Sequence, residues 1–177
     1  MKSTKGATRY AKALLELSIE QNKLAITEAN MNYLIQVNND VKEFHTLIHS
    51  PIINADKKIK AFEAIFSNFD ELTNLFLNLI IKNKRESILP EIAQSFIKQL
   101  KAYNGITPIT IVSAVALNEA TKTAILAKVQ SSVSGILEVT EKVDASLIGG
   151  FIVQLDGKQI DTSVLSQFNN LKQRLTK

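Results

Sequence analysis

The 177-residue sequence contains no cysteine and no tryptophan, and it has only three prolines and six glycines. Without cysteine the fold cannot depend on disulfides, and a thiol nucleophile or a cysteine-ligated metal is excluded. No stretch reaches the roughly 20 consecutive apolar residues of a membrane-spanning helix, and the basic start of the chain lacks the pattern of a signal peptide. These absences favour a globular protein without direct membrane insertion.

The overall composition is that of an ordinary globular protein, with 45% hydrophobic and 21% charged residues. The net charge of +4 permits contact with an anionic partner without requiring one. Two basic clusters, Lys57-Lys58-Lys60 and Lys82-Lys84-Arg85, leave a basic helical nucleic-acid-binding protein open as an alternative function. Because neither cluster has interleaved aromatic residues, a solvated helix face is the favoured interpretation.

The first hundred residues carry apolar side chains at helical spacing. Proline and capping residues mark several of the helix ends: Ser50 before Pro51 ends the third helix, and Pro90 fits only a first turn. The pattern predicts an N-terminal bundle of six helices. We expect them at about residues 7–19, 27–37, 41–48, 56–66, 70–83 and 88–100.

Tyr103-Asn104-Gly105 provides a helix end, and a different pattern follows it. Alternating β-branched residues predict strands at about 109–115, 137–143 and 151–155, with a helix at about 119–133 between the first two. Asp156-Gly157 favours a hairpin turn, and the spacing from Val164 to Leu175 predicts a terminal helix. We therefore expect a mainly α-helical protein with two domains, a six-helix bundle over 1–105 and a small α/β domain of order β-α-β-β-α over 106–177.

No arrangement of residues in the sequence predicts catalysis. His45 and His49 are four residues apart, but the helix lacks the glutamate of the metalloprotease motif and no third ligand is evident. Gly149-Gly150 lies before a strand and lacks the phosphate-loop pattern, so these glycines are expected to allow close backbone packing. A small hydrolase would need a pocket that holds a titratable group with a shifted pKa. We therefore predict no catalytic residue, no cofactor and no metal.

Apolar surface is what the sequence has in excess. The stretch from Tyr10 to Leu15 and the helix at 70–83, which is apolar nearly all round, together exceed what six short helices must bury. A groove that accepts an amphipathic helix of a partner would explain the excess, and simple core packing explains it equally well.

Several motifs in collinear order resemble those of one family, the delta subunit of F-type ATP synthase, which includes the mitochondrial oligomycin-sensitivity-conferring protein. The resemblance covers almost the whole chain and is most specific at its C-terminal end. The matching segments are Arg9-Tyr10-Ala11-Lys12-Ala13-Leu14, Ser50-Pro51, Ile88-Leu89-Pro90-Glu91-Ile92, Val143-Asp144, Ser146-Leu147-Ile148-Gly149-Gly150-Phe151 and Ile160-Asp161 with Ser163-Val164.

The resemblance implies a non-catalytic stator subunit with one end on the catalytic head and the other on the peripheral stalk. The helical domain would bind the N-terminal helix of an alpha subunit between its first and fifth helices. The C-terminal domain would bind the ends of the b subunits, for which the terminal helix is the expected contact. The alpha-binding positions would be Tyr10, Ala11, Leu14, Leu75, Phe76 and Leu79, and the b-binding positions Val164, Phe168, Leu171 and Leu175.

The resemblance also carries an expectation about location. Met1 lies directly before the first expected helix, which leaves no room for a transit peptide. A bacterial subunit at the cytoplasmic face of the plasma membrane, peripheral through its complex and present in one copy per complex, is therefore expected.

Overall fold

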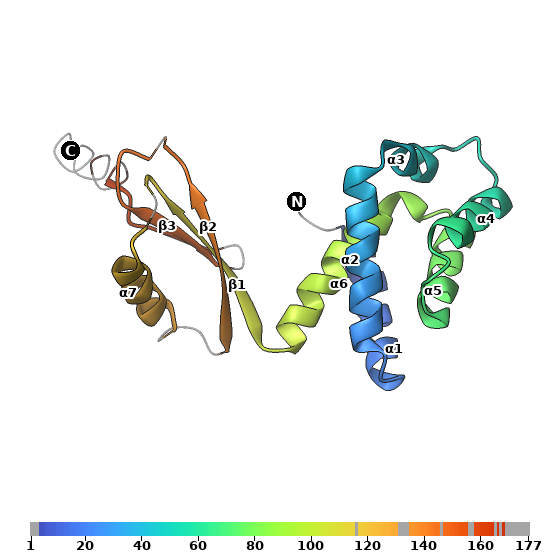
Figure 1. Ribbon diagram of the computed structural model, residues 1–177, viewed down its shortest axis with the longest axis horizontal. Helices are drawn as coiled ribbons and strands as arrows, with labels where there is room; N and C mark the ends of the chain where they lie inside the picture. Colours follow the sequence, from blue (N-terminus) through green and yellow to red (C-terminus); the bar gives the residue numbers. More distant parts are fainter. Residues whose placement is uncertain are drawn as a thin grey trace. The chain divides into compact units, whose positions relative to one another are not determined.

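The structure is a computed structural model that describes residues 4–115, 117–130, 135–145, 147–155, 158–164, 166 and 168. Backbone contacts divide the chain into two compact units, residues 1–100 and 101–177. The described residues are mostly helical, with one small mixed sheet (Figure 1). The predicted boundary at residue 105 lies just beyond this division, after the end of the last helix of the first unit.

The first unit consists of α-helices that match the predicted segments closely. Helix α2 starts earlier than expected because the chain turns directly after α1: Asn22 adopts φ 54°, and the Lys23 amide donates to the Ser18 carbonyl at 2.9 Å. Helix α6 has Pro90 as its second residue, where the missing amide is not needed. The elements are α1 Lys5–Glu20, α2 Leu24–Asp40, α3 Lys42–His49, α4 Ala55–Ile65, α5 Glu71–Lys82, the 3₁₀ helix η1 Glu86–Ile88 and α6 Leu89–Tyr103.

One apolar core holds these helices together, and a few buried hydrogen bonds fix their register. Phe66 stacks on Phe69 with ring centroids 4.6 Å apart and meets Phe44 edge-on at 5.7 Å. The buried Ser18 hydroxyl lies 3.1 Å from that of Thr27, which joins α1 to α2. Both hydroxyl groups thus have a partner in the core, which offsets the cost of burying them.

The second unit is a four-stranded sheet with one described helix. The strand order is β2-β1-β3-β4; β1 pairs with β2 in parallel and with β3 antiparallel, and β3 pairs antiparallel with β4. Helix α7 makes the crossover between the parallel strands and lies against one face of the sheet, where Ile125 and Val129 pack on Ile109, Ile111 and Val153 (Figure 1). The elements are β1 Ile106–Ser113, α7 Glu119–Gln130, β2 Ile136–Val143, β3 Phe151–Leu155 and β4 Lys158–Asp161.

The expected order β-α-β-β-α omitted one strand. The pairing of β3 with β4 forms the two arms of the predicted hairpin, whose turn residues Asp156 and Gly157 lie outside the described residues. The second arm is a strand of its own because the backbone of β3 offers it a free edge, although the KQID sequence has no apolar alternation. Beyond β4, the described residues Val164, Ser166 and Phe168 are helical, at the start of the predicted terminal helix.

The expectation that Gly149 and Gly150 are packing positions is confirmed. Gly150 has φ 79°, and a Cβ placed there would lie 2.6 Å from the carbonyl oxygen of Thr162 and 3.0 Å from Cα of Ser163. The amide of Val164 donates to the carbonyl of Gly149 at 3.0 Å. The two glycines therefore hold the 149–150 segment against the chain that leaves β4.

Candidate functional site

Helix α1 carries two adjacent apolar stripes. Thr4 caps it by accepting a hydrogen bond from the Ala7 amide at 3.3 Å, and the helix then runs without interruption to Glu20. One stripe is wholly buried in the core and consists of Ala7, Ala11, Leu14 and Ser18. The neighbouring stripe, one residue earlier at each turn, is partly or fully exposed and consists of Gly6, Tyr10, Ala13 and Leu17.

The predicted alpha-binding residues divide between these two environments. Ala11 and Leu14 have no exposed surface, and Phe76 is 7% exposed, so these three support the surface from beneath. Tyr10 is partly buried, whereas Leu75 is 62% exposed and Leu79 50% exposed. Of the six predicted positions, Tyr10, Leu75 and Leu79 are therefore the ones available to touch another molecule.

Helix α5 is fixed firmly at its N-terminus. Asp70 accepts a hydrogen bond from the Leu72 amide at 3.1 Å and forms a salt bridge with Lys23 at 3.1 Å. Burial by itself raises the pKa of Asp70, but the hydrogen bond from Lys23, the Leu72 amide and the Lys23 charge outweigh it, so the pKa lies below the ordinary value. The carboxylate therefore stays charged at neutral pH and anchors α5 to the start of α2.

The other end of α5 fixes the position of Arg85. The Lys84 amide donates to the Ile81 carbonyl at 2.9 Å, and the Arg85 amide donates to the Ile80 carbonyl at 3.0 Å. Lys84 adopts φ 55°, so these bonds form a Schellman motif with a lysine at the left-handed position where glycine is usual. The backbone of Arg85 is thus held in place directly after the helix.

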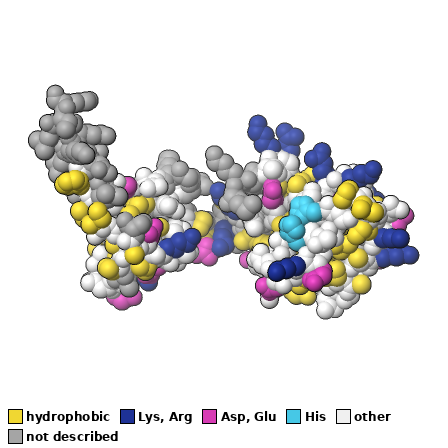
Figure 2. Space-filling model, turned by 90° about the horizontal axis from the view of Figure 1, so that it is seen from above, with side chains coloured by type: hydrophobic (Ala, Val, Ile, Leu, Met, Phe, Trp, Pro, Cys, Tyr) yellow, Lys and Arg dark blue, Asp and Glu magenta, His cyan; other side chains and the backbone are white. Residues whose placement is uncertain are grey.

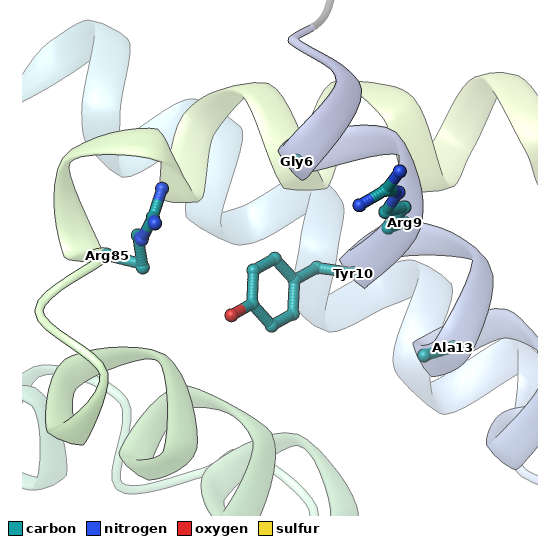
Figure 3. A pocket seen from close by; sticks show the side chains of 5 residues that line it. All are labelled: Gly6, Arg9, Tyr10, Ala13 and Arg85. Atoms are coloured by element: carbon teal, nitrogen blue, oxygen red, sulfur yellow. The ribbon is translucent and has the colours of Figure 1, made fainter.

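Arg85 and four residues of α1 line one open pocket of about 470 Å³. Figure 3 shows the ring of Tyr10 projecting from α1 between the Arg9 and Arg85 side chains. The small residues Gly6 and Ala13 let another backbone approach α1 closely. The lining residues are Gly6, Arg9, Tyr10, Ala13 and Arg85. The pocket therefore combines an aromatic ring, two small residues and two guanidinium groups.

The sequence interpretation missed four of the five lining residues. Gly6 and Ala13 were hidden because both stripes of α1 consist of small and apolar residues, and periodicity alone does not tell which stripe faces the core. Arg85 was counted in a basic cluster with Lys82 and Lys84, and Arg9 was noted only within a motif. Nothing in the linear sequence brings these two arginines to one pocket.

The predicted b-binding positions are only partly within the described residues. Val164 is 49% exposed and Phe168 is 65% exposed, and their spacing of four places them on one helix face. Ile148, in the segment that packs against Val164 through Gly149, is 74% exposed. All three side chains are apolar and exposed, while Leu171 and Leu175 lie outside the described residues.

The start of the terminal helix is held by a small hydrogen-bond network. The Ser163 hydroxyl accepts from the Ser166 amide at 3.3 Å, and the Asp161 carboxylate accepts from the Ser163 amide at 2.8 Å and the Ser166 hydroxyl at 2.6 Å. The bond from the Ser166 hydroxyl is the main cause that holds the pKa of Asp161 below its ordinary value, and Ser163 adds to it. This network directs the chain from β4 into the helix.

The Asp161 network predicts a pH dependence at this one position. Because the folded pKa is below the unfolded value, the network stabilises the fold above the ordinary carboxyl pKa of 3.8 and loses its effect as the pH falls through the lowered value. In an NMR titration of the Asp161 carboxyl carbon, Ser166→Ala should raise the pKa toward 3.8. An unchanged pKa in this variant would contradict the network.

Neither the histidine pair nor the first lysine cluster supports an alternative site. His45 and His49 lie side by side on α3 with ring centroids 4.4 Å apart, visible as the cyan group in Figure 2, yet within the described residues no three His, Cys, Asp or Glu side chains are grouped to hold a metal. Lys58 is buried and bonds Glu86 at 2.5 Å, so its cluster offers only Lys57 and Lys60 to a nucleic acid. In the part of the chain that the structure describes, no helix is long and apolar enough to cross a bilayer.

Comparison with known proteins gives one consistent family. The family model described as ATP synthase delta (OSCP) subunit matches residues 7–175. The chain is 32% identical to ATP synthase subunit delta of Flavobacterium psychrophilum, covering 99% of both chains, and 32% identical to that of Cytophaga hutchinsonii, covering 99% of this chain and 97% of the relative.

A solved structure agrees with the fold. A chain of the mitochondrial ATP synthase hexamer of Toxoplasma gondii matches with a TM-score of 0.75 and 20% identity, over 98% of this chain and 99% of that one. The sequence resemblance and the nearly complete coverage by the family model lead to the same result. This chain belongs to the ATP synthase delta (OSCP) subunit family.

Proposed function

We propose that the chain is a non-catalytic stator subunit of an F-type ATP synthase, which links the catalytic head to the peripheral stalk so that rotor torque drives ATP synthesis. The match of the family model over residues 7–175 is the observation that carries this proposal. The division into two units supports it further, because a linker that resists torque needs a separate attachment at each end. Such a role requires no cofactor and no catalytic residue.

Each unit has its own partner in this proposal. The helical unit, proposed as residues 1–105, binds the N-terminal helix of an alpha subunit across Tyr10, Leu75 and Leu79. The C-terminal unit, proposed as residues 106–177, binds the b subunits through Val164 and Phe168, with Leu171 and Leu175 further along. One copy serves each complex, at the cytoplasmic face of a bacterial plasma membrane, and it is peripheral through the complex.

The exposed leucines of α5 are the strongest support for the alpha-binding surface. Leu75 and Leu79 are four residues apart, so they form a ridge on a helix whose other apolar residues are buried. Solvent exposure of two leucines on one ridge costs free energy that a partner helix would recover by covering them. Tyr10 on α1 offers a large amphipathic contact of the kind enriched in binding hot spots.

Calorimetric titration with a synthetic peptide of the alpha N-terminus tests this surface. Leu79→Ala and Tyr10→Ala should each weaken binding by about 1–2 kcal/mol, because each removes apolar contact that binding buries. Ile26→Ala is the matched control, since Ile26 is 51% exposed on α2 and lies outside the surface. The Ile26→Ala variant should bind the peptide with the same affinity as the wild-type protein.

Two outcomes would contradict the alpha-binding assignment. The first is the absence of any binding by the folded wild-type protein. The second is binding elsewhere, for example at the separate apolar pocket of about 490 Å³ that Tyr33, Val41 and Leu47 help to line. Amide chemical shifts would distinguish the two surfaces, because the peptide should shift signals from α1 and α5 and leave those of α3 unchanged.

A further inference from the structure

The pocket beside Tyr10 holds positive charge that the fold does not use. Arg9 and Arg85 are both exposed, and neither forms a salt bridge within the described residues. Glu86, which follows Arg85 in the sequence, and Glu91, which contacts the start of α1, have other partners. Glu86 bonds Lys58 at 2.5 Å, and Glu91 accepts a hydrogen bond from the Thr4 amide at 3.2 Å.

The two arginines are also held at defined places. Arg9 projects from the first turns of α1, which Thr4 caps, and Arg85 follows the Schellman motif that closes α5. Figure 3 shows them on either side of the Tyr10 ring. The pocket beside this ring is therefore lined by one arginine of α1 and by one arginine that follows the end of α5.

We propose that Arg9 and Arg85 form a carboxylate clamp at the end of the alpha-binding surface, which takes an aspartate or glutamate side chain of the bound helix and sets its direction. This inference rests on the proposed function, since the ligand is the same helix. A guanidinium presents donors in a planar fork that matches a carboxylate, and its hydrogen bonds to a charged acceptor are among the stronger ones. A lysine or a neutral side chain at that point of the partner would lose this pairing.

The clamp would determine the orientation of the bound helix, which the apolar part of the surface leaves open. Tyr10, Leu75 and Leu79 offer apolar contacts that an amphipathic helix satisfies in either orientation. A carboxylate at one end of the partner's apolar stripe reaches the arginines in only one orientation, and the reversed helix leaves both guanidinium groups unpaired. Opposite charges across an interface select partner and register in this way.

The test combines protein variants with peptide variants in the full-length chain. Arg9→Gln and Arg85→Gln should each weaken binding of the alpha peptide by about 3- to 10-fold, as expected for a partly exposed charge pair. Lys60→Gln removes the same charge from an exposed position on α4 and should leave the affinity unchanged. Acidic residues of the peptide are then changed singly to their amides, and one of these changes should abolish the penalty of Arg85→Gln.

The outcomes separate the clamp from the surface. If the peptide binds and Leu79→Ala weakens it, but both arginine variants bind like Lys60→Gln, the clamp is wrong and the surface stands. If no single acid-to-amide change in the peptide couples to Arg85→Gln, the clamp is equally wrong. If the peptide does not bind, or Leu79→Ala has no effect, the proposed function of the helical unit fails first.

Discussion

Replacing Lys58 by methionine should lower the free energy of unfolding of the helical unit by about 3–5 kcal/mol. The Lys58 side chain is 3% exposed and its ammonium lies 2.5 Å from a carboxylate oxygen of Glu86, whose side chain is 13% exposed. The second oxygen of that carboxylate is buried without a hydrogen-bond partner. Removal of the lysine therefore leaves a buried charge with nothing to compensate it.

Two further variants identify the buried pair as the cause. Lys57→Met changes the exposed neighbour and should alter the free energy by no more than about 0.5 kcal/mol. The double variant Lys58→Met/Glu86→Leu removes both charges and should regain most of the lost stability, because an apolar pair needs no charge compensation. Urea unfolding followed by circular dichroism measures all three. A loss in Lys58→Met no larger than that in Lys57→Met would contradict the argument.

Gly150→Ala should destabilise the C-terminal unit by about 2–4 kcal/mol, since it adds both backbone strain and a steric overlap. Gly150 adopts φ 79°, and the new Cβ would lie 2.6 Å from the Thr162 carbonyl oxygen. These neighbours are backbone atoms, so relief requires the chain between β4 and the terminal helix to move. Amide hydrogen exchange in the β1, β3 and β4 strands measures the loss.

Gly149→Ala is the matched control for this prediction. Its Cβ would meet the Val164 Cγ2 atom at 3.2 Å, and Gly149 does not have a positive φ. Because the Val164 side chain is half-exposed and can shift, we expect a loss below about 1 kcal/mol. Exchange in α1–α6 should remain unchanged in both variants, because these helices belong to a separate compact unit. Equal losses in the two glycine variants would contradict the role of Gly150.

The helices were predicted well because capping residues and prolines mark several of their ends in the local sequence. Asp70 before α5, Ser50-Pro51 after α3 and Pro90 in the first turn of α6 all act within a few residues of the boundary that they set. Strand β4 was missed because its pairing comes from β3 and not from its own sequence. The start of α2 was missed for a different reason: Asn22 takes the left-handed conformation, which is one of several that the sequence allows.

The candidate surface could be predicted only in outline. The excess of apolar residues on the first and fifth helices indicated a surface for a partner. However, helix periodicity placed Tyr10 on one face with Ala11 and Leu14, and the structure leaves only Tyr10 partly exposed. The carboxylate clamp depends on the Schellman end of α5 and on the packing of α1 near it, so only the tertiary structure brings Arg9 and Arg85 together.

The place of β1 in the sheet bears on how the chain is made. Domains generally fold in order during synthesis, and α1–α6 are complete before any strand has been translated. Strand β1 is the first to leave the ribosome but occupies an interior position, and both of its hydrogen-bonding edges stay open until β2 and β3 arrive. A newly made chain thus carries a finished helical unit beside an apolar strand that other nascent chains can bind, and chaperone dependence should concentrate in this interval.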